Sequence, residues 1–206
     1  MAQPLNETTL LQAVQVLAAR DGHLAGIVAR FGPPPLWARE PGFATLVHII
    51  LEQQVSLASA RAAYQKLVEA TGSVTPARLL ELSDAELKSV GFSRQKTAYA
   101  RSLAAALLDA RLDLSQLSDL DDHQVRAQLM SIKGIGPWTA DIYLLMALGR
   151  PDIWPSGDLA LAAAVQRAKG LATRPSSAEL LEISLTWQPW RAVAARILWH
   201  FYLSTV

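Results

Sequence analysis

Cysteine is absent from this sequence of 206 residues. Its absence excludes disulfide bonds, a cysteine-ligated iron–sulfur cluster and a thiol nucleophile. Histidine is also scarce, with four copies that lie far apart in the sequence, at positions 23, 48, 123 and 200. A zinc site needs several such ligands close together, so this scatter argues against one. We expect no catalytic cofactor.

Long apolar runs are missing too. Apolar runs such as those at 103–108 and 143–148 fall well short of the roughly 20 residues that a membrane span needs. The first residues hold no basic segment leading into an apolar one, so the sequence predicts no secretory signal. Hydrophobic residues make up 51% and charged residues 18%, a composition typical of an ordered globular protein. We expect a soluble, cytoplasmic protein that makes no membrane contact.

A large excess of either charge is also lacking, since 19 basic and 18 acidic residues leave a net charge of +1. Proteins that bind nucleic acids are often strongly basic, so this balance says little in favour of such a partner. If the chain grips phosphates, it must do so through local geometry and not through bulk charge.

Strand signals are weak, because no window combines period-two alternation with β-branched enrichment. The eleven prolines all fall in loops or at expected helix starts. The sequence therefore predicts an all-α fold of about ten helices, with the proline-rich stretch 33–41 as a linker. Expected helix caps include Asn6, Thr75, Ser83, Ser93, Asp121 and Ser176.

The most informative stretch is a short hairpin between two helices, Lys133-Gly134-Ile135-Gly136-Pro137. Its glycines permit positive φ and expose backbone N–H groups, while Ile135 can plug the turn. Pro137 and Thr139 begin the next helix, whose first amides have no intrahelical partner and favour an anion such as a DNA phosphate. Lys133 adds one charge. The alternative is a plain tight turn between helices.

Backbone carbonyls of the same hairpin can face outward and hold a monovalent cation, either sodium or potassium. The expected ligands are the carbonyl oxygens of Met130, Ile132 and Ile135.

A carboxylate follows shortly after, in Pro155-Ser-Gly-Asp158. An Asp at this position is often only the N-cap of the next helix. It can also be catalytic, and one side chain can fill both roles.

Together these motifs carry a resemblance. The sequence from Ile132 to Ala140 with Pro155–Asp158 resembles the helix–hairpin–helix and Gly/Pro…Asp motif of a DNA glycosylase superfamily. Within it, the chain is similar to the AlkA/Mag-type 3-methyladenine (alkylpurine) glycosylases. The likeness covers most of the chain and includes Glu52–Ser56, Gly91–Lys96 and the tryptophans at 187, 190 and 199.

The resemblance implies two helical lobes with a cleft between them, without an iron–sulfur cluster or an N-terminal β domain. Residues 42–150 would form a six-helix lobe that contains the hairpin, and residues 1–41 plus 151–206 the second lobe. The implied partner is double-stranded DNA containing damaged bases, bound by a monomer. The implied reaction flips out an alkylated purine and hydrolyses its N-glycosidic bond, leaving an abasic site.

The resemblance also assigns roles in this chemistry. Asp158, held as a carboxylate, would stabilise the positive charge that develops on the sugar. Trp138 stands where lyase-type relatives carry a lysine that forms a Schiff base, which implies a monofunctional enzyme. Trp138, Trp199 and Ile142 would line the base pocket, although some relatives have an aromatic residue in place of Ile142.

Other residues would contact the DNA. Gln53 and Gln54 lie where relatives place the residue that fills the gap left by the flipped base, and some members carry an aliphatic wedge in place of Gln54. The implied DNA-binding residues are Lys133, Gly134, Ile135, Gly136, Thr139 and Lys96. A solvated surface is the simpler interpretation of Lys96.

Two alternatives remain open. One is a glycosylase for an oxidised or deaminated base on the same scaffold. The other is a non-catalytic helix–hairpin–helix DNA-binding module, which would have no need of a carboxylate at Asp158.

Overall fold

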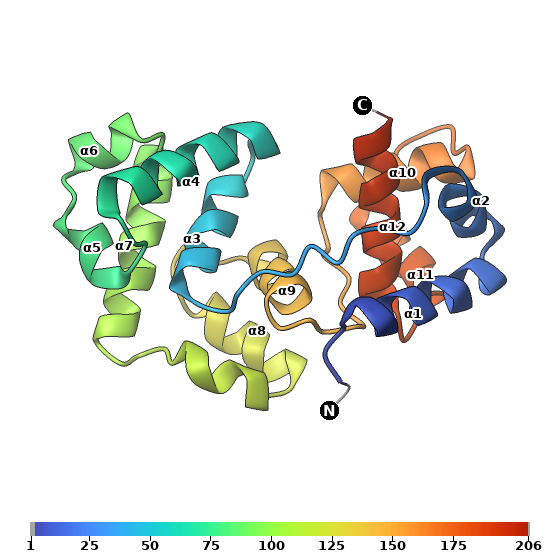
Figure 1. Cartoon of the computed structure of the whole chain (residues 1–206), viewed down its shortest axis with the longest axis horizontal. Helices are drawn as coiled ribbons and strands as arrows, with labels where there is room; N and C mark the ends of the chain where they lie inside the picture. Colours follow the sequence, from blue (N-terminus) through green and yellow to red (C-terminus); the bar gives the residue numbers. More distant parts are fainter. Residues whose placement is uncertain (1–2, 206) are drawn as a thin grey trace. The chain divides into compact units, whose positions relative to one another are not determined.

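The computed structural model describes residues 3–205, and these contain twelve α-helices and one 3₁₀-helix but no β-strand (Figure 1). The predicted all-α fold class is therefore confirmed. No helix in this range has the length and apolar character needed to cross a membrane. The helices are α1 (Glu7–Arg20), α2 (Gly22–Phe31), α3 (Phe43–Glu52), α4 (Leu57–Thr71), α5 (Pro76–Glu81), α6 (Asp84–Ser89), α7 (Arg94–Leu108), η1 (Leu114–Asp119), α8 (Asp122–Met130), α9 (Pro137–Met146), α10 (Leu159–Lys169), α11 (Ser177–Leu185) and α12 (Arg191–Ser204).

The chain folds into two compact units. The central unit is Arg39–Tyr143, and the terminal unit combines Met1–Ala38 with Leu144–Val206. The sequence interpretation placed these boundaries at 41/42 and 150/151. The second boundary in the structure falls within α9, so this helix begins in the central unit and ends in the terminal unit.

Most helices begin where the sequence predicts, because a capping side chain occupies the expected position. Each cap accepts a hydrogen bond from the backbone N–H three residues later, which stabilises a helix start by about 1 kcal/mol. The predicted caps that the structure confirms are Asn6, Thr75, Ser83, Ser93, Asp121 and Ser176.

Other helix limits were not foreseen. Asp21, which was not among the expected caps, caps α2, and η1 was not predicted. Helix α12 begins at Arg191, and its N-cap residue Trp190 makes no side-chain capping hydrogen bond.

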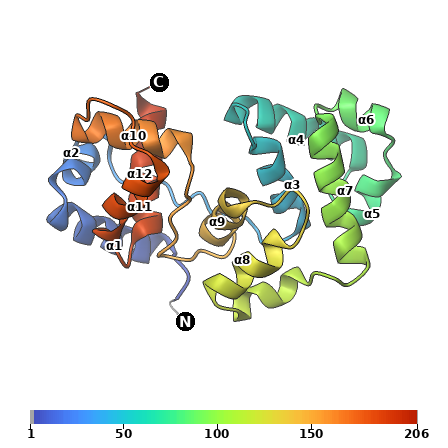
Figure 2. The same ribbon diagram turned by 180° about the vertical axis from the view of Figure 1, so that it is seen from behind.

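The terminal unit is built around α12, which packs against α1, α2, α10 and α11 (Figure 2). Eight consecutive residues of α12, Ala192–Trp199, are buried. A helix that is buried on every side must be apolar nearly all round, and its small alanines allow its neighbours to approach closely.

Arg196 is the exception within this buried stretch, with 1% of its surface exposed. Its guanidinium donates to three carbonyl oxygens, those of Leu36 at 2.8 Å, Ala192 at 3.0 Å and Leu145 at 2.8 Å. Burial lowers the pKa of Arg196 to about 10, so the side chain is still charged at neutral pH. These bonds satisfy a buried cation and join the proline-rich segment and the end of α9 to α12.

The central unit is organised around α7, which packs against α3, α5 and α6, while α3 also packs against α4. Helix α3 is strongly apolar, and six of its ten residues are buried. Because α3 ends at Glu52, the packing of α3 on α7 fixes where the following loop leaves the core.

Asp21, at the junction of α1 and α2, joins these two helices to the end of α10 and to the loop after α11. One carboxylate oxygen caps α2 by accepting the N–H groups of His23 and Leu24. The other accepts the Trp187 indole N–H at 2.9 Å and the Lys169 ammonium at 3.3 Å. Burial acts to raise the pKa of Asp21, but these hydrogen bonds and Lys169 outweigh it, so the pKa lies below its ordinary value of 3.8.

This arrangement predicts an acid-sensitive contribution to stability. Because the pKa of Asp21 is lowered on folding, its contribution is fully present above pH 3.8 and is lost as the pH falls through the lower folded-state value. We expect Asp21→Asn to reduce the free energy of unfolding by about 1–2 kcal/mol at pH 7. Urea unfolding of both proteins between pH 7 and pH 3 should show this difference shrinking below pH 4. A difference that stays constant over the whole range would contradict the assignment.

Candidate functional site

The hairpin joins α8 to α9 through a tight turn within the central unit. Two successive turns shape it, because the N–H of Ile132 donates to Leu129 O and that of Ile135 donates to Ile132 O, both at 3.1 Å. The Gly136 carbonyl then accepts the Ala140 N–H at 3.0 Å, which starts α9. Ile135 is 4% exposed and fills the turn, as the sequence suggested, while Lys133 is exposed.

The turn requires a glycine at position 134. Its φ is +94°, in the region that favours glycine, and a Cβ added there would lie 2.0 Å from Cγ of Tyr99. Gly136 is different: its φ is not in the positive region, and an added Cβ would meet nothing within 4 Å. A residue before proline prefers an extended conformation, which explains the difference.

The start of α9 has the properties of an anion site. Gly136 precedes the helix and has no side chain that could accept a hydrogen bond from the first-turn amides. The positive end of the helix dipole lies at the same place, and the exposed Lys133 is three residues away in sequence. The Thr139 side chain points inward, with 2% of the residue exposed, so only its backbone can serve this site.

Gln53 and Gln54, which the sequence treated alike, have different environments. The Gln53 amide nitrogen donates to Gly134 O at 3.0 Å and to Thr139 Oγ1 at 2.9 Å. Gln54 is exposed and has a φ of +57°, which is uncommon for a residue with a side chain. The hairpin thus holds one glutamine, and the other projects from the surface.

Lys96 has an internal partner. Its ammonium donates to the carbonyl oxygen of Leu51 at 2.6 Å, in the last turn of α3. A cation there also complements the negative end of the helix dipole. Burial lowers the pKa of Lys96.

In the terminal unit, Asp158 lies at the start of α10 and is 9% exposed. A turn with Gly157 at a φ of +82° delivers it. Its Oδ1 accepts the Leu161 N–H at 2.9 Å and the Trp199 indole N–H at 3.3 Å. The structure therefore brings together Asp158 and Trp199, which the sequence linked only through the resemblance. Asp158 thus caps α10 and also presents a carboxylate in a fixed orientation.

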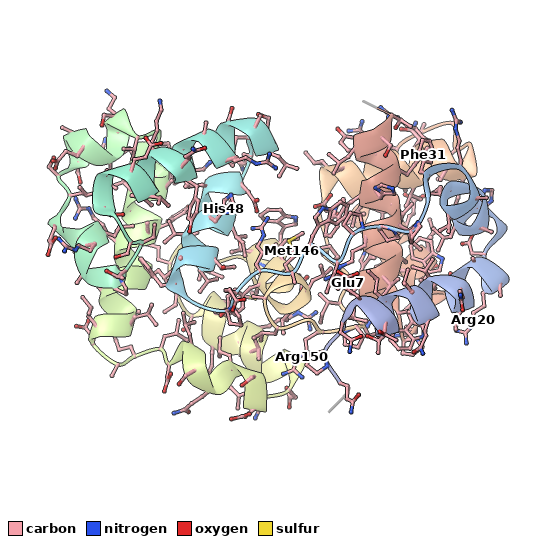
Figure 3. All side chains as sticks on the ribbon, viewed as in Figure 1. Glu7, Arg20, Phe31, His48, Met146 and Arg150 are labelled. Atoms are coloured by element: carbon pink, nitrogen blue, oxygen red, sulfur yellow. The ribbon has the colours of Figure 1, made fainter. Side chains whose placement is uncertain are left out.

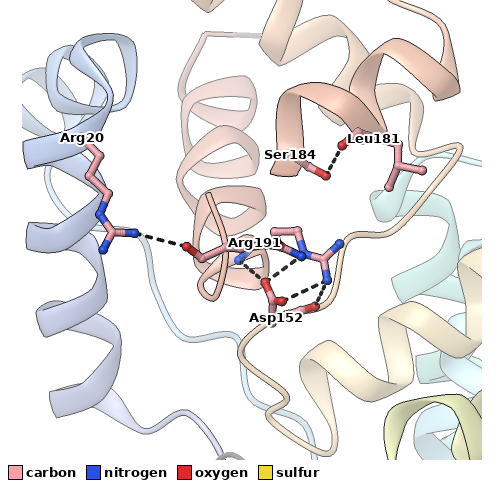
Figure 4. A network of polar contacts seen from close by, with 6 residues as sticks. Arg20, Asp152, Leu181, Ser184 and Arg191 are labelled. Carbon is pink, nitrogen blue, oxygen red and sulfur yellow. Dashed lines mark hydrogen bonds and ion pairs between the residues drawn. The ribbon is translucent and has the colours of Figure 1, made fainter. Parts of the chain in front are cut away.

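A second tie holds the loop that carries Asp158. Arg191, at the first turn of α12, donates through Nε and Nη2 to the two carboxylate oxygens of Asp152, at 2.8 Å and 3.0 Å (Figure 4). Arg191 also donates its backbone N–H to the same carboxylate at 3.2 Å. The α9–α10 loop is thus fixed to α12 at Asp152, and Asp158 is joined to α12 again through Trp199. Sequence reasoning missed this pair, since no motif signals a bond between residues so far apart.

Trp138 and Ile142 are four residues apart on α9, so they share one face of the helix. Trp138 is half-buried and Ile142 is 3% exposed. Both belong to the part of α9 that lies in the central unit.

His48, on α3, belongs to a separate cluster (Figure 3). Its ring stacks on Tyr64 with centroids 4.3 Å apart, and its Nε2 lies 3.7 Å from Glu52 Oε1. Glu52 is also held by two hydrogen bonds from Arg39, at 2.7 Å and 3.1 Å. Burial, together with Arg39 and Arg61, lowers the pKa of His48 despite Glu52, which favours the neutral ring.

Comparison with known families agrees with this arrangement of hairpin and downstream carboxylate. A family model described as the HhH-GPD superfamily of base excision DNA repair proteins matches residues 47–189. The chain belongs to the HhH-GPD superfamily. The matched region includes the hairpin, Asp158 and both glutamines of the α3–α4 loop.

Individual known proteins are also similar over much of the chain. The DNA-3-methyladenine glycosylase of Bacillus subtilis is 28% identical over 170 residues, which are 77% of this chain and 56% of that protein. This chain thus spans little more than half the length of that relative. The crystal structure of a Bacillus halodurans DNA-3-methyladenine glycosidase is 29% identical, with a TM-score of 0.74 over 92% of this chain and 88% of that one.

A further solved structure shares the fold. Schizosaccharomyces pombe Mag1, a 3-methyladenine DNA glycosylase solved with abasic DNA, gives a TM-score of 0.83 at 24% identity. The match covers 91% of this chain and 95% of that chain.

The hairpin geometry predicts opposite outcomes for its two glycines. Gly134→Ala forces a side chain into the left-handed region and against Tyr99, so we expect a loss of ~2–4 kcal/mol in the free energy of unfolding. Gly136→Ala meets no neighbour and should cost less than about 1 kcal/mol. Urea unfolding of both variants measures the difference. Equal destabilisation would show that the contact with Tyr99 is unimportant.

Proposed function

We propose that this chain is a monofunctional DNA glycosylase that removes alkylated purines of the 3-methyladenine class from double-stranded DNA, acting as a monomer. The observation that carries the proposal is Asp158, a buried carboxylate held by two donors at a helix start, downstream of a hairpin with the features of a phosphate site. Family membership and the names of the similar proteins support it.

Asp158 suits hydrolysis of an N-glycosidic bond. Departure of the base leaves positive charge on the deoxyribose, and a nearby anion lowers the free energy of that transition state. The same carboxylate can orient the attacking water. Since the Leu161 N–H and the Trp199 indole both donate to Oδ1, the group is oriented before the substrate arrives.

Trp138 makes the enzyme monofunctional in this proposal. Strand cleavage by a lyase requires an amine that forms a Schiff base with the sugar. An indole nitrogen carries no basic lone pair and cannot do so. The product is therefore an intact strand with an abasic site.

Trp199, in the terminal unit, is assigned to contact the base, and Trp138 and Ile142, in the central unit, keep the base-recognition role that the family resemblance gives them. Alkylated purines are electron-poor and often cationic, so an indole face attracts them by about 0.5–2 kcal/mol relative to an apolar surface. The hydrogen bond to Asp158 restrains the Trp199 ring and couples the pocket to the catalytic group. Ile142, in place of an aromatic residue, leaves a less aromatic pocket than in some relatives.

DNA binding is assigned to the hairpin and to the loop after α3. The Gly134–Gly136 backbone, the first amides of α9 and Lys133 would hold a phosphate, with the Thr139 backbone contributing. Gln54 is the better gap-filling residue, because it is exposed whereas the Gln53 amide nitrogen is bound to the hairpin. Lys96 supports α3 in this assignment and does not contact phosphate.

We also propose that the hairpin holds a sodium or potassium ion. The ligands would be the carbonyl oxygens of Met130, Ile132 and Ile135, a donor type suited to hard cations. Ile132 O already accepts one N–H, and a carbonyl oxygen has a second lone pair for an ion. Such an ion would add positive charge beside the phosphate site.

The direct test is base release from duplexes that carry a panel of alkylated, oxidised and deaminated bases. We expect release of alkylated purines by the wild type and a loss of roughly 100-fold or more in single-turnover rate for Asp158→Asn. Strand breaks should appear only after alkali or heat. Equal rates for the two proteins would overturn the role of Asp158, and breaks without alkali would overturn the monofunctional assignment.

The hydrogen bond between Trp199 and Asp158 has its own test. Trp199→Phe keeps an aromatic ring but removes the N–H donor, so we expect the single-turnover rate to fall by ~10-fold or more. Trp187→Phe is the matched control, because it removes an indole donor to Asp21 in the same unit. The control should lower stability and leave the rate unchanged. Equal rate losses in both variants would indicate a general effect on the fold.

A further inference from the structure

The α3–α4 loop, Gln53–Ser56, is joined directly to the hairpin by one side chain. The Gln53 amide has two N–H donors, and its nitrogen lies 3.0 Å from Gly134 O and 2.9 Å from Thr139 Oγ1. A carbonyl can only accept, so the NH₂ end must face Gly134. Gly134 lies before the start of α9 and Thr139 within its first turn. Gln53 therefore binds both sides of the point where the phosphate site is proposed.

The loop is short and fixed at both ends. At its first residue, Gln53 is bound to the hairpin. At its last, Ser56 caps α4 by accepting the Ser59 N–H at 3.2 Å. Between them lie Gln54 and Val55, both exposed, and Gln54 holds an uncommon φ of +57°. A strained conformation persists only where the surrounding structure determines it, and here the two fixed ends supply that constraint.

Helix α7 supports the loop and the hairpin together. Lys96 donates to Leu51 O, two residues before Gln53. Tyr99, one turn later on α7, lies against Gly134 so closely that no Cβ fits there. The same helix thus holds the end of α3 and the base of the hairpin, and the Gln53 amide closes the connection between them.

We propose that Gln53 is a positioning residue that fixes the distance between the phosphate-binding hairpin and Gln54, the residue that enters the DNA. The inference rests on the proposed function of this site. When the hairpin binds a phosphate, the α3–α4 loop, which Gln53 fixes to the hairpin, places Gln54 at a set distance along the same duplex. Insertion then needs no further ordering of the loop, so phosphate binding contributes directly to opening the base pair.

The test uses Gln53→Met, which keeps the length of the side chain and removes both donors, alone and combined with Gln54→Ala in the full chain. Three quantities are measured: affinity for an undamaged duplex as a function of salt, fluorescence of 2-aminopurine placed beside the lesion, and single-turnover base release. We expect Gln53→Met to lower the 2-aminopurine signal and to slow base release by ~10-fold. Affinity for undamaged DNA and its salt dependence should change by less than about twofold.

The double variant separates positioning from a general structural role. If Gln53 acts through Gln54, then Gln53→Met has little further effect once Gln54 is alanine. Independent, multiplicative losses would overturn the proposal, and so would an equal loss of affinity for undamaged DNA. Thr139→Val removes one of the two acceptors at nearly constant volume and should give a smaller loss of the same kind. If Gln53→Met fails to fold, the same three measurements on Thr139→Val test the proposal in its place.

The fluorescence readout also separates this inference from the proposed function. Wild-type protein that releases no base but unstacks 2-aminopurine in a Gln53-dependent way would refute the glycosylase and support the positioning role. Base release together with a 2-aminopurine signal that does not depend on Gln53 would support the glycosylase and refute the positioning role.

Discussion

The backbone at Gly134 is the constraint on which the central unit's functional surface depends. The contact with Tyr99 leaves no room for a side chain, and only glycine adopts a φ of +94° at no steric cost. Gly134 lies in the turn between α8 and α9, three residues before α9 begins, and its carbonyl oxygen accepts the hydrogen bond from Gln53. One torsion angle thus determines where the first amides of α9 point and where the α3–α4 loop is anchored.

In the terminal unit, one carboxylate oxygen likewise serves two purposes. Oδ1 of Asp158 accepts the N–H that caps α10 and the indole N–H that joins it to α12. Helix α12 is buried from Ala192 to Trp199, and the Asp152–Arg191 pair fixes the preceding loop to the same helix. The simpler interpretation of Asp158 as an N-cap and the catalytic one therefore describe the same geometry. A carboxylate held in this way needs little reorganisation when charge develops beside it.

Local signals were the predictable part of the fold. Caps such as Ser83 and Ser176 act within four residues, and the helix that each opens was expected from sequence. Hydrogen bonds between residues far apart in the sequence are not marked by any local pattern of this kind. Nothing in the sequence distinguishes Gln53 from Gln54, and the difference arises because only the first meets Gly134. Asp21 was missed for the same reason, since its partners Trp187 and Lys169 lie 166 and 148 residues away in the chain. The hairpin and Asp158 were found because their spacing within a family motif is local.

The net charge of +1 bears on how the chain would bind a DNA phosphate. Many of the 19 basic side chains are engaged within the fold. Those with internal carboxylate or carbonyl partners include Arg39, Lys96, Arg101, Arg126, Arg191 and Arg196. Because basic and acidic charges nearly balance, the chain as a whole attracts DNA only weakly at long range. In the proposed function a phosphate is therefore held mainly by directed N–H groups at the start of α9, with Lys133 as a minor addition. Such a site depends on short-range geometry more than on counterion release. Its affinity should therefore depend less steeply on salt than that of a strongly basic protein.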